Sequence, residues 1–230
     1  MYDINMGIRM KISIASNIFV AVMTAVAFVM MTFGWGSENS LFSLSGVQNL
    51  KFFTVLSNLF SGVVSAVFAA MLIGRRGVAP YALYVLKLAA TVAVAVTFFT
   101  VVILFMVIFG LGGMFYGANF WFHLVLPLVS IIEFCLLDTG VRLRLSATFA
   151  GLVPVVLYGI AYFANILING VGEWPNTNDW YGFLSFGGLE SAPIVSVMML
   201  VATWLIALVI WAINRVTGSQ SRRHQSNKLG

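Results

Sequence analysis

Six long apolar runs dominate this 230-residue chain. A transmembrane α-helix needs about 20 consecutive, mostly apolar residues, and each run approaches or exceeds that length. The runs do not alternate between apolar and polar residues, as the strands of a membrane β-barrel do. Because lipid offers no hydrogen bonds to an open backbone, helices remain as the spanning structure. The sequence therefore predicts an all-α membrane protein, a six-transmembrane-helix bundle with spans at residues 12–34, 50–73, 82–110, 119–137, 147–169 and 191–214.

Charged residues are scarce, and most of them lie outside the apolar runs. They make up 8% of the chain, too few for the polar shell of a soluble domain of this size. Basic residues flank the spans on one side and acidic residues on the other, except that Lys51 lies on the acidic side at the start of the second span. The basic flanks are Arg9, Lys11, Arg75, Arg76, Arg142, Arg144, Arg215, Arg222, Arg223 and Lys228, and the acidic ones are Glu38, Glu173, Asp179 and Glu190. The positive-inside rule then places both termini in the cytoplasm.

The same charge pattern sets the domain organisation. No linker divides the chain, so we expect one transmembrane domain over residues 1–214 and a basic cytoplasmic tail over residues 215–230. The net charge of +5 follows from the topology, and no nucleic-acid partner is expected. The chain has no signal for a particular oligomeric state.

Motifs for metals and cofactors are missing from the sequence. The chain has a single cysteine, Cys135, so no intrachain disulfide can form. It has two histidines, and one of them, His224, falls in the basic tail. One intramembrane histidine is too few for a metal site. No glycine-rich nucleotide loop stands in a suitable context. We expect no metal and no cofactor.

The second span carries a polar face. Lys51, Thr54, Ser57, Asn58 and Ser61 recur at three- and four-residue spacing, which places them on one side of a helix. Small polar residues commonly form the seam between two packed membrane helices. A polar site inside the bundle is the other interpretation.

The fourth span carries His123 at a similar depth. Thr54 and His123 each lie about four residues inside the predicted outer end of a span. Asn119 is a candidate N-cap for this helix. Pro127 lacks the N–H that would bond the carbonyl of His123, so we expect a free carbonyl and a kink there. The alternative to a functional role is an interfacial histidine bonded to a neighbouring helix.

Two further charges lie within spans, nearer the cytoplasmic side. Lys87 and Glu133 enter the membrane to matching depths, which predicts a structural ion pair, with a proton or ion path as the alternative. On the outer side, the last external connection is rich in aromatic residues, which suggests that it lies against the interface or caps a cavity. Asn165 and Glu190 lie at the same outer level.

Two motifs resemble a known family. The segments F-F-T-V-L-S-N around Thr54 and W-F-H-L-V-L-P around His123, with six spans, resemble the androgen-induced and androgen-dependent TFPI-regulating membrane proteins. The similarity is greater to bacterial six-span relatives, which implies a bacterial cell membrane. Animal members are threonine hydrolases that cleave fatty-acid esters of hydroxy fatty acids. By position, the resemblance makes Thr54 the nucleophile and His123 the base.

The resulting expectation is an intramembrane hydrolase of lipid esters whose partner is a membrane lipid or fatty-acyl ester. Candidates for binding the substrate or its oxyanion are Lys51, Asn58, Asn119, Asn165 and Glu190. Glu190 or a backbone carbonyl would orient His123. The alternatives are a non-enzymatic small transporter or lipid-binding membrane protein, and a structural membrane subunit.

Overall fold

The computed structural model describes residues 2–35, 46–75, 77, 79–110, 114–173, 177–186 and 188–226. Within these residues the secondary structure is entirely helical, and six helices are long and apolar enough to cross a membrane. The predicted fold class is therefore confirmed. The spans are Gly7–Thr32, Phe53–Gly74, Tyr81–Phe105, Ala118–Leu136, Leu145–Asn169 and Gly188–Gln220. Glu38, Arg76 and Lys228, three charges used for the topology, lie outside the described residues.

Several spans combine helices of different pitch. The first span lies in α1 (Tyr2–Thr32). The second is α2 (Phe53–Gly74), which follows the 3₁₀-helix η1 (Gly46–Lys51). The third is α3 (Tyr81–Phe99) with the π-helix η2 (Thr100–Phe105), and α4 (Met106–Phe109) follows it. The fourth consists of α6 (Ala118–Phe120), the π-helix η3 (Trp121–Val125) and α7 (Leu126–Leu136). The last two are η4 (Leu145–Leu152) with α8 (Val153–Asn169), and η6 (Gly188–Ser191) with α9 (Ala192–Ser226), preceded by η5 (Phe183–Phe186).

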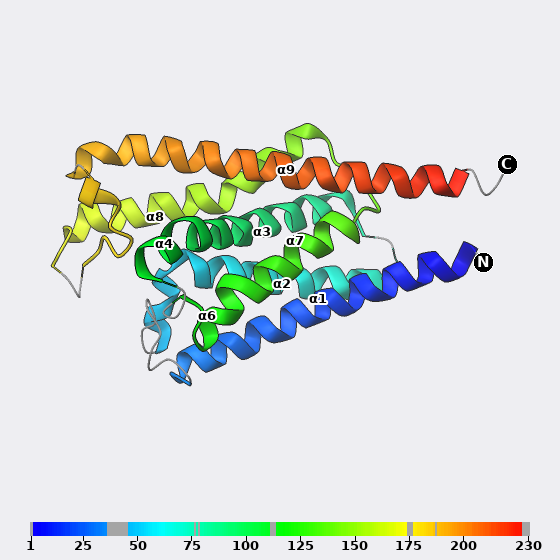
Figure 1. Cartoon of the computed structure of the whole chain (residues 1–230), viewed down its shortest axis with the longest axis horizontal. Helices are drawn as coiled ribbons and strands as arrows, with labels where there is room; N and C mark the ends of the chain where they lie inside the picture. Colours follow the sequence, from blue (N-terminus) through cyan, green and yellow to red (C-terminus); the bar gives the residue numbers. More distant parts are fainter. Residues whose placement is uncertain are drawn as a thin grey trace.

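Both chain ends lie at the same end of the bundle (Figure 1). We call it the termini end; the opposite end, which holds η1 and residues 177–186, is the loop end. α3 is the most deeply buried span, whereas α8 and most of α9 expose their apolar side chains. α1 and α9 lie on opposite sides of the bundle, with α2, α3 and α7 between them (Figure 1). The charge pattern predicts that the termini end is cytoplasmic.

Candidate functional site at the loop end

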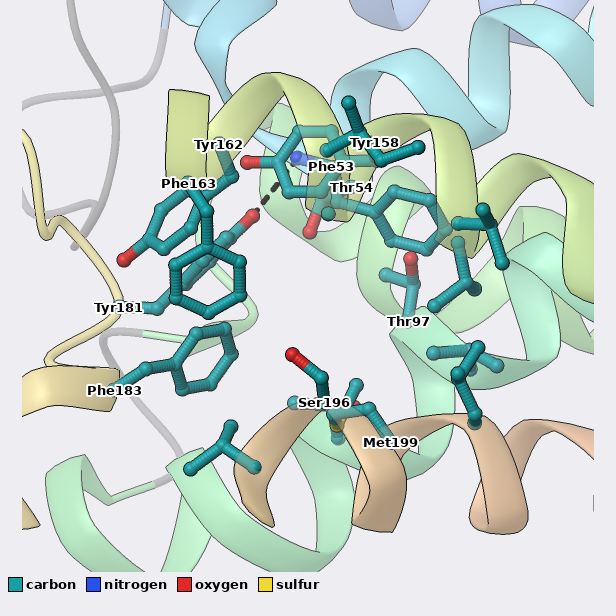
Figure 2. Close-up of a pocket in the computed structure, with 18 of the residues that line it drawn as sticks. Phe53, Thr54, Thr97, Tyr158, Tyr162, Phe163, Tyr181, Phe183, Ser196 and Met199 are labelled. Carbon is teal, nitrogen blue, oxygen red and sulfur yellow. Dashed lines mark hydrogen bonds between the residues drawn. The ribbon is translucent and has the colours of Figure 1, made fainter. Parts of the chain in front are cut away.

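Two cavities lie near the loop end, and Thr54 borders both. The larger cavity has a volume of about 370 Å³ and lies among α2, α3, α8, α9 and the 177–186 segment. Figure 2 shows Thr54 and Thr97 on one side of it and Ser196 of α9 on another. The smaller cavity measures about 20 Å³ and is lined by Met31, Phe52, Thr54, Val55, Phe105, Asn119, His123 and Tyr181. The structure thus brings Thr54, Asn119 and His123 together.

Thr54 is the second residue of α2, where backbone N–H groups have no intrahelical acceptor. The neighbouring N–H groups find other acceptors. That of Phe53 donates to the Tyr181 hydroxyl at 2.8 Å, and that of Val55 donates to the Phe52 carbonyl at 3.1 Å. Among the described residues, neither the N–H nor the hydroxyl of Thr54 has a hydrogen-bond partner. Both groups are therefore available to a ligand.

Two tyrosines explain why α2 begins at Phe53 and not at residue 50, where the apolar run starts. The Tyr158 hydroxyl of α8 donates to the Lys51 carbonyl at 2.6 Å, so a side chain from another helix satisfies that carbonyl. Tyr181 holds the N–H of Phe53. Phe52, between them, has an extended backbone. Residues before it form η1, and Thr54 is left at the helix N-terminus, not one turn inside it.

His123 is buried in the π-helix η3, and one of its ring nitrogens has a fixed partner. Its Nδ1 lies 2.6 Å from the carbonyl oxygen of Met114. Because a carbonyl can only accept, Nδ1 carries the proton, and the neutral ring keeps a lone pair on Nε2. A backbone carbonyl therefore orients the imidazole, which was one of the two predicted options. Among the described residues no hydrogen bond joins His123 to Thr54, although the two border the same cavity.

Asn58 connects the turns that carry Thr54 and His123. In a π-helix the carbonyl of Phe122 would accept from the N–H five residues on, but that residue is Pro127. Asn58 Nδ2 donates to this carbonyl at 3.0 Å and to the Thr54 carbonyl at 2.8 Å. The carbonyl that Asn58 satisfies is thus one residue earlier than the α-helical register predicts. Its amide hydrogens are occupied, so Asn58 positions the site and is not placed to bind an oxyanion.

The remaining candidates divide between the site and the surface. Asn119 is buried at the smaller cavity; it is not an N-cap, because the helix starts at Ala118 after Gly117, so that prediction is wrong. The Lys51 ammonium lies over the Trp180 ring, 5.1 Å from its centroid, and partial burial lowers its pKa. Lys51, Asn165 and Glu190 do not border either cavity.

Asn165 and Glu190 have local roles. The amide of Asn165 donates to Asn178 at 3.0 Å, and its oxygen accepts from Asn169 at 2.9 Å. Glu190 is exposed in η6. Neither side chain orients His123 in this structure. Residues predicted at the same outer depth therefore do not all meet at one site.

The aromatic connection lines one side of the larger cavity, in agreement with the predicted role of capping a cavity. Tyr181 and Phe183 border the cavity. Asp179 holds the segment in place: it accepts a hydrogen bond from the Tyr162 hydroxyl and one from the Phe183 N–H at 2.9 Å. Neither Asp179 nor Tyr181 was predicted as a site residue. The signal available in the sequence is an acid beside aromatic residues in an external connection. Trp174 and its neighbours up to residue 176 lie outside the described residues.

A second polar cluster lies toward the termini end. The Lys87 ammonium is 3.1 Å from Glu133 and also donates to Asn17 at 2.6 Å and to Ser65 at 2.7 Å. Asn17 in turn donates to the second oxygen of Glu133. The predicted ion pair is therefore present. We call this group, together with Arg9, Ser13, Asp138 and Thr139, the inner cluster.

Asp138 belongs to the inner cluster and was not predicted. Its Oδ1 accepts from Ser13 at 2.6 Å, while Oδ2 is buried and has no hydrogen bond among the described residues. Burial raises the pKa of this carboxyl, and the nearby Lys87 opposes that shift. Arg9 bonds the adjacent Thr139 at 2.6 Å. The available signal was an acid directly after the fourth span, beside basic flanks.

No protein-family model matches this chain, and no curated protein or solved structure matches it either. Among the described residues, no group of three or more His, Cys, Asp and Glu side chains is placed to hold a metal ion.

Proposed function

We propose that this protein is an intramembrane lipid-ester hydrolase in which Thr54 is the nucleophile and His123 the general base. The observation that carries the proposal is that Thr54 borders both cavities, one apolar and one containing an imidazole. The resemblance of the two motifs suggests esters of fatty acids with hydroxy fatty acids as substrates, in a bacterial cell membrane.

The larger cavity suits a hydrocarbon chain. Its volume of about 370 Å³ lies in the range of ligand pockets, and most of its lining is apolar. Val156 and Ile160 of α8 border it and are also exposed on the bundle surface. An acyl chain from the bilayer would therefore enter beside α8 and place its ester carbonyl at Thr54.

The neutral imidazole of His123 has the free Nε2 lone pair that a general base needs. Nε2 of His123 takes the proton of the Thr54 hydroxyl as the oxygen attacks the ester carbonyl. The imidazolium then protonates the leaving alkoxide, and an acyl-Thr54 ester remains. The Met114 carbonyl fixes the tautomer that this step needs. In an enzyme without substrate, a long separation between nucleophile and base is common.

The first turn of α2 supplies a donor for the oxyanion. The N–H of Thr54 has no acceptor among the described residues, and it lies at the positive end of the 22-residue helix α2. A backbone N–H aimed at the developing charge is the usual device for stabilising a tetrahedral intermediate. Asn119, at the smaller cavity, is the second candidate donor.

The test uses the purified protein in detergent, a fluorophosphonate probe and an oleoyl ester of hydroxystearic acid. We expect the wild type to be labelled and to hydrolyse the ester, and Thr54→Ala to do neither. Thr54→Ser should retain part of the activity because the hydroxyl remains. Thr100→Ala is the matched control, since Thr100 borders the larger cavity alone. Full hydrolysis by Thr54→Ala would refute the assignment.

The apolar cavity also supports a second candidate, a lipid-binding protein without catalysis. In that case wild type and Thr54→Ala would bind the ester equally, and neither would hydrolyse it. Equal retention of the intact ester by both proteins, measured by mass spectrometry, would favour this candidate over the hydrolase.

A further inference from the structure

We infer that the smaller cavity is the binding site of the hydrolytic water that releases the acyl group from Thr54. This inference rests on the proposed function. It adds where the water, the second substrate of the hydrolysis, binds, and how large a molecule can take its place. It makes water, and not a lipid alcohol, the acceptor of the acyl group.

The size of the cavity selects one small molecule. A single water needs a cavity of roughly 10–15 Å³, and this cavity measures about 20 Å³. A water also needs two to four polar partners. The Thr54 hydroxyl and Nε2 of His123 supply two, and Asn119 also borders the cavity, while the rest of the lining is apolar or aromatic. A fatty alcohol or a glyceride does not fit.

The wall between the cavities separates the two substrates. Thr54, Phe105 and Tyr181 border both cavities. Tyr181 is held there by the N–H of Phe53, at 2.8 Å from its hydroxyl. An acyl group on the Thr54 oxygen therefore has its chain in the larger cavity and its carbonyl at the wall. The smaller cavity lies on the other side, beside His123.

The imidazole is available for this second step. Nδ1 is committed to the Met114 carbonyl, so Nε2 is the nitrogen that can accept a proton. Nε2 removes one proton from the water as its oxygen bonds to the acyl carbon. The tetrahedral intermediate then breaks its bond to the Thr54 oxygen, which takes the proton back from the imidazolium. The products are a free fatty acid and Thr54 with its hydroxyl restored.

Val55 allows the smaller cavity to be changed alone. It is buried, and it borders the smaller cavity but not the larger one. Val55→Ile adds one methylene there and should displace the water. Val64→Ile, the matched control, adds the same methylene at another buried valine of α2, one that borders neither cavity. Val55→Ala enlarges the smaller cavity and should admit methanol.

The experiment follows acyl-Thr54 by intact-protein mass spectrometry after mixing with p-nitrophenyl palmitate. Val55→Ile should acylate normally and deacylate roughly 10-fold or more slowly, because displacing a reacting group by about 1 Å can cost up to 100-fold. Val64→Ile should deacylate at the wild-type rate. In aqueous methanol, Val55→Ala should form several-fold more methyl palmitate per fatty acid than the wild type.

The outcomes separate the two proposals. If wild type never forms acyl-Thr54, the proposed function fails and this inference with it. If acyl-Thr54 forms but Val55→Ile deacylates as fast as the wild type, the water site is elsewhere. Should Val55→Ile fail to fold, the methanol ratio decides: an equal ratio in wild type and Val55→Ala overturns the inference.

Discussion

The loop-end site and the Lys87–Glu133 pair of the inner cluster use polar groups inside the same bundle in opposite ways. In the inner cluster, the Lys87 ammonium makes three hydrogen bonds and both oxygens of Glu133 are bonded. At the loop end, the hydroxyl and the N–H of Thr54 have no partner among the described residues. Bonded buried groups stabilise a fold, whereas unbonded groups at a cavity are placed for a ligand.

The difference also sets what each region contributes to stability. A buried ion pair is costly to break, since removing one partner leaves an uncompensated charge. A hydroxyl without a protein partner contributes little when it is removed. We therefore expect variants of the inner cluster to lose stability, and variants of Thr54 to lose activity alone.

The first prediction concerns which region faces the outside, because its effect is all-or-none. With Cys135 replaced by Ala, single cysteines are placed at two exposed positions, Glu173, which follows the loop-end terminus of α8, and Gln220, near the C-terminal end of α9. An impermeant maleimide should label the Glu173→Cys protein in intact cells, and Gln220→Cys only after permeabilisation. The reverse pattern would place the loop-end site at the cytoplasmic face.

The second prediction separates activity from stability at the loop end. Thr54→Ala should lower hydrolysis to the background rate and change the free energy of unfolding by less than about 0.5 kcal/mol. His123→Ala should also abolish hydrolysis, and it should cost about 1–3 kcal/mol because the Met114 carbonyl loses its donor. Thermal melting in detergent provides the stability measurement. A large destabilisation by Thr54→Ala would restore the packing-seam interpretation of the second span.

The ion pair was predictable from the sequence because an unpaired charge inside a span is costly. Lys87 and Glu133 enter the bilayer to matching depths from the same side, so each is the available partner of the other, and they do pair. The convergence of Thr54 and His123 followed in the same way from depth. What sequence could not give was the set of contacts made across the bundle by residues distant in the chain.

Asn58 illustrates that limit. Its place on the polar face of α2 was evident, but its partner depends on the π-helical register around His123, which shifts the acceptor carbonyl to Phe122. The role of Tyr181 likewise depends on a connection folding back onto the start of α2. Asn165 and Glu190 failed as site residues because equal depth does not fix the direction in which a side chain points.

The third prediction tests the inner cluster. Glu133→Gln should lower the free energy of unfolding by about 3–5 kcal/mol, because Lys87 then remains charged without its partner. Lys87→Met combined with Glu133→Leu should recover much of the loss, since well-packed apolar residues often replace a buried ion pair at little cost. Hydrolysis per folded molecule should stay near wild type. A double variant less stable than either single variant would contradict the pairing.

The fourth and smallest effect concerns the link between the two turns of the loop-end site. Asn58→Ala removes the donor to the Phe122 carbonyl, which should cost about 1–3 kcal/mol as an unsatisfied buried group.

Pro127→Ala provides the matched test of that link, since it restores a backbone N–H five residues beyond Phe122, where the π-helical register can use it. Its stabilising effect should therefore be larger in the Asn58→Ala background than in the wild type, by about 0.5–1.5 kcal/mol for one net hydrogen bond. The coupling is read from the four melting curves of a double-mutant cycle. Additive effects would mean that Asn58 does not replace the missing proline donor, and the positioning of His123 would then depend on Met114 alone.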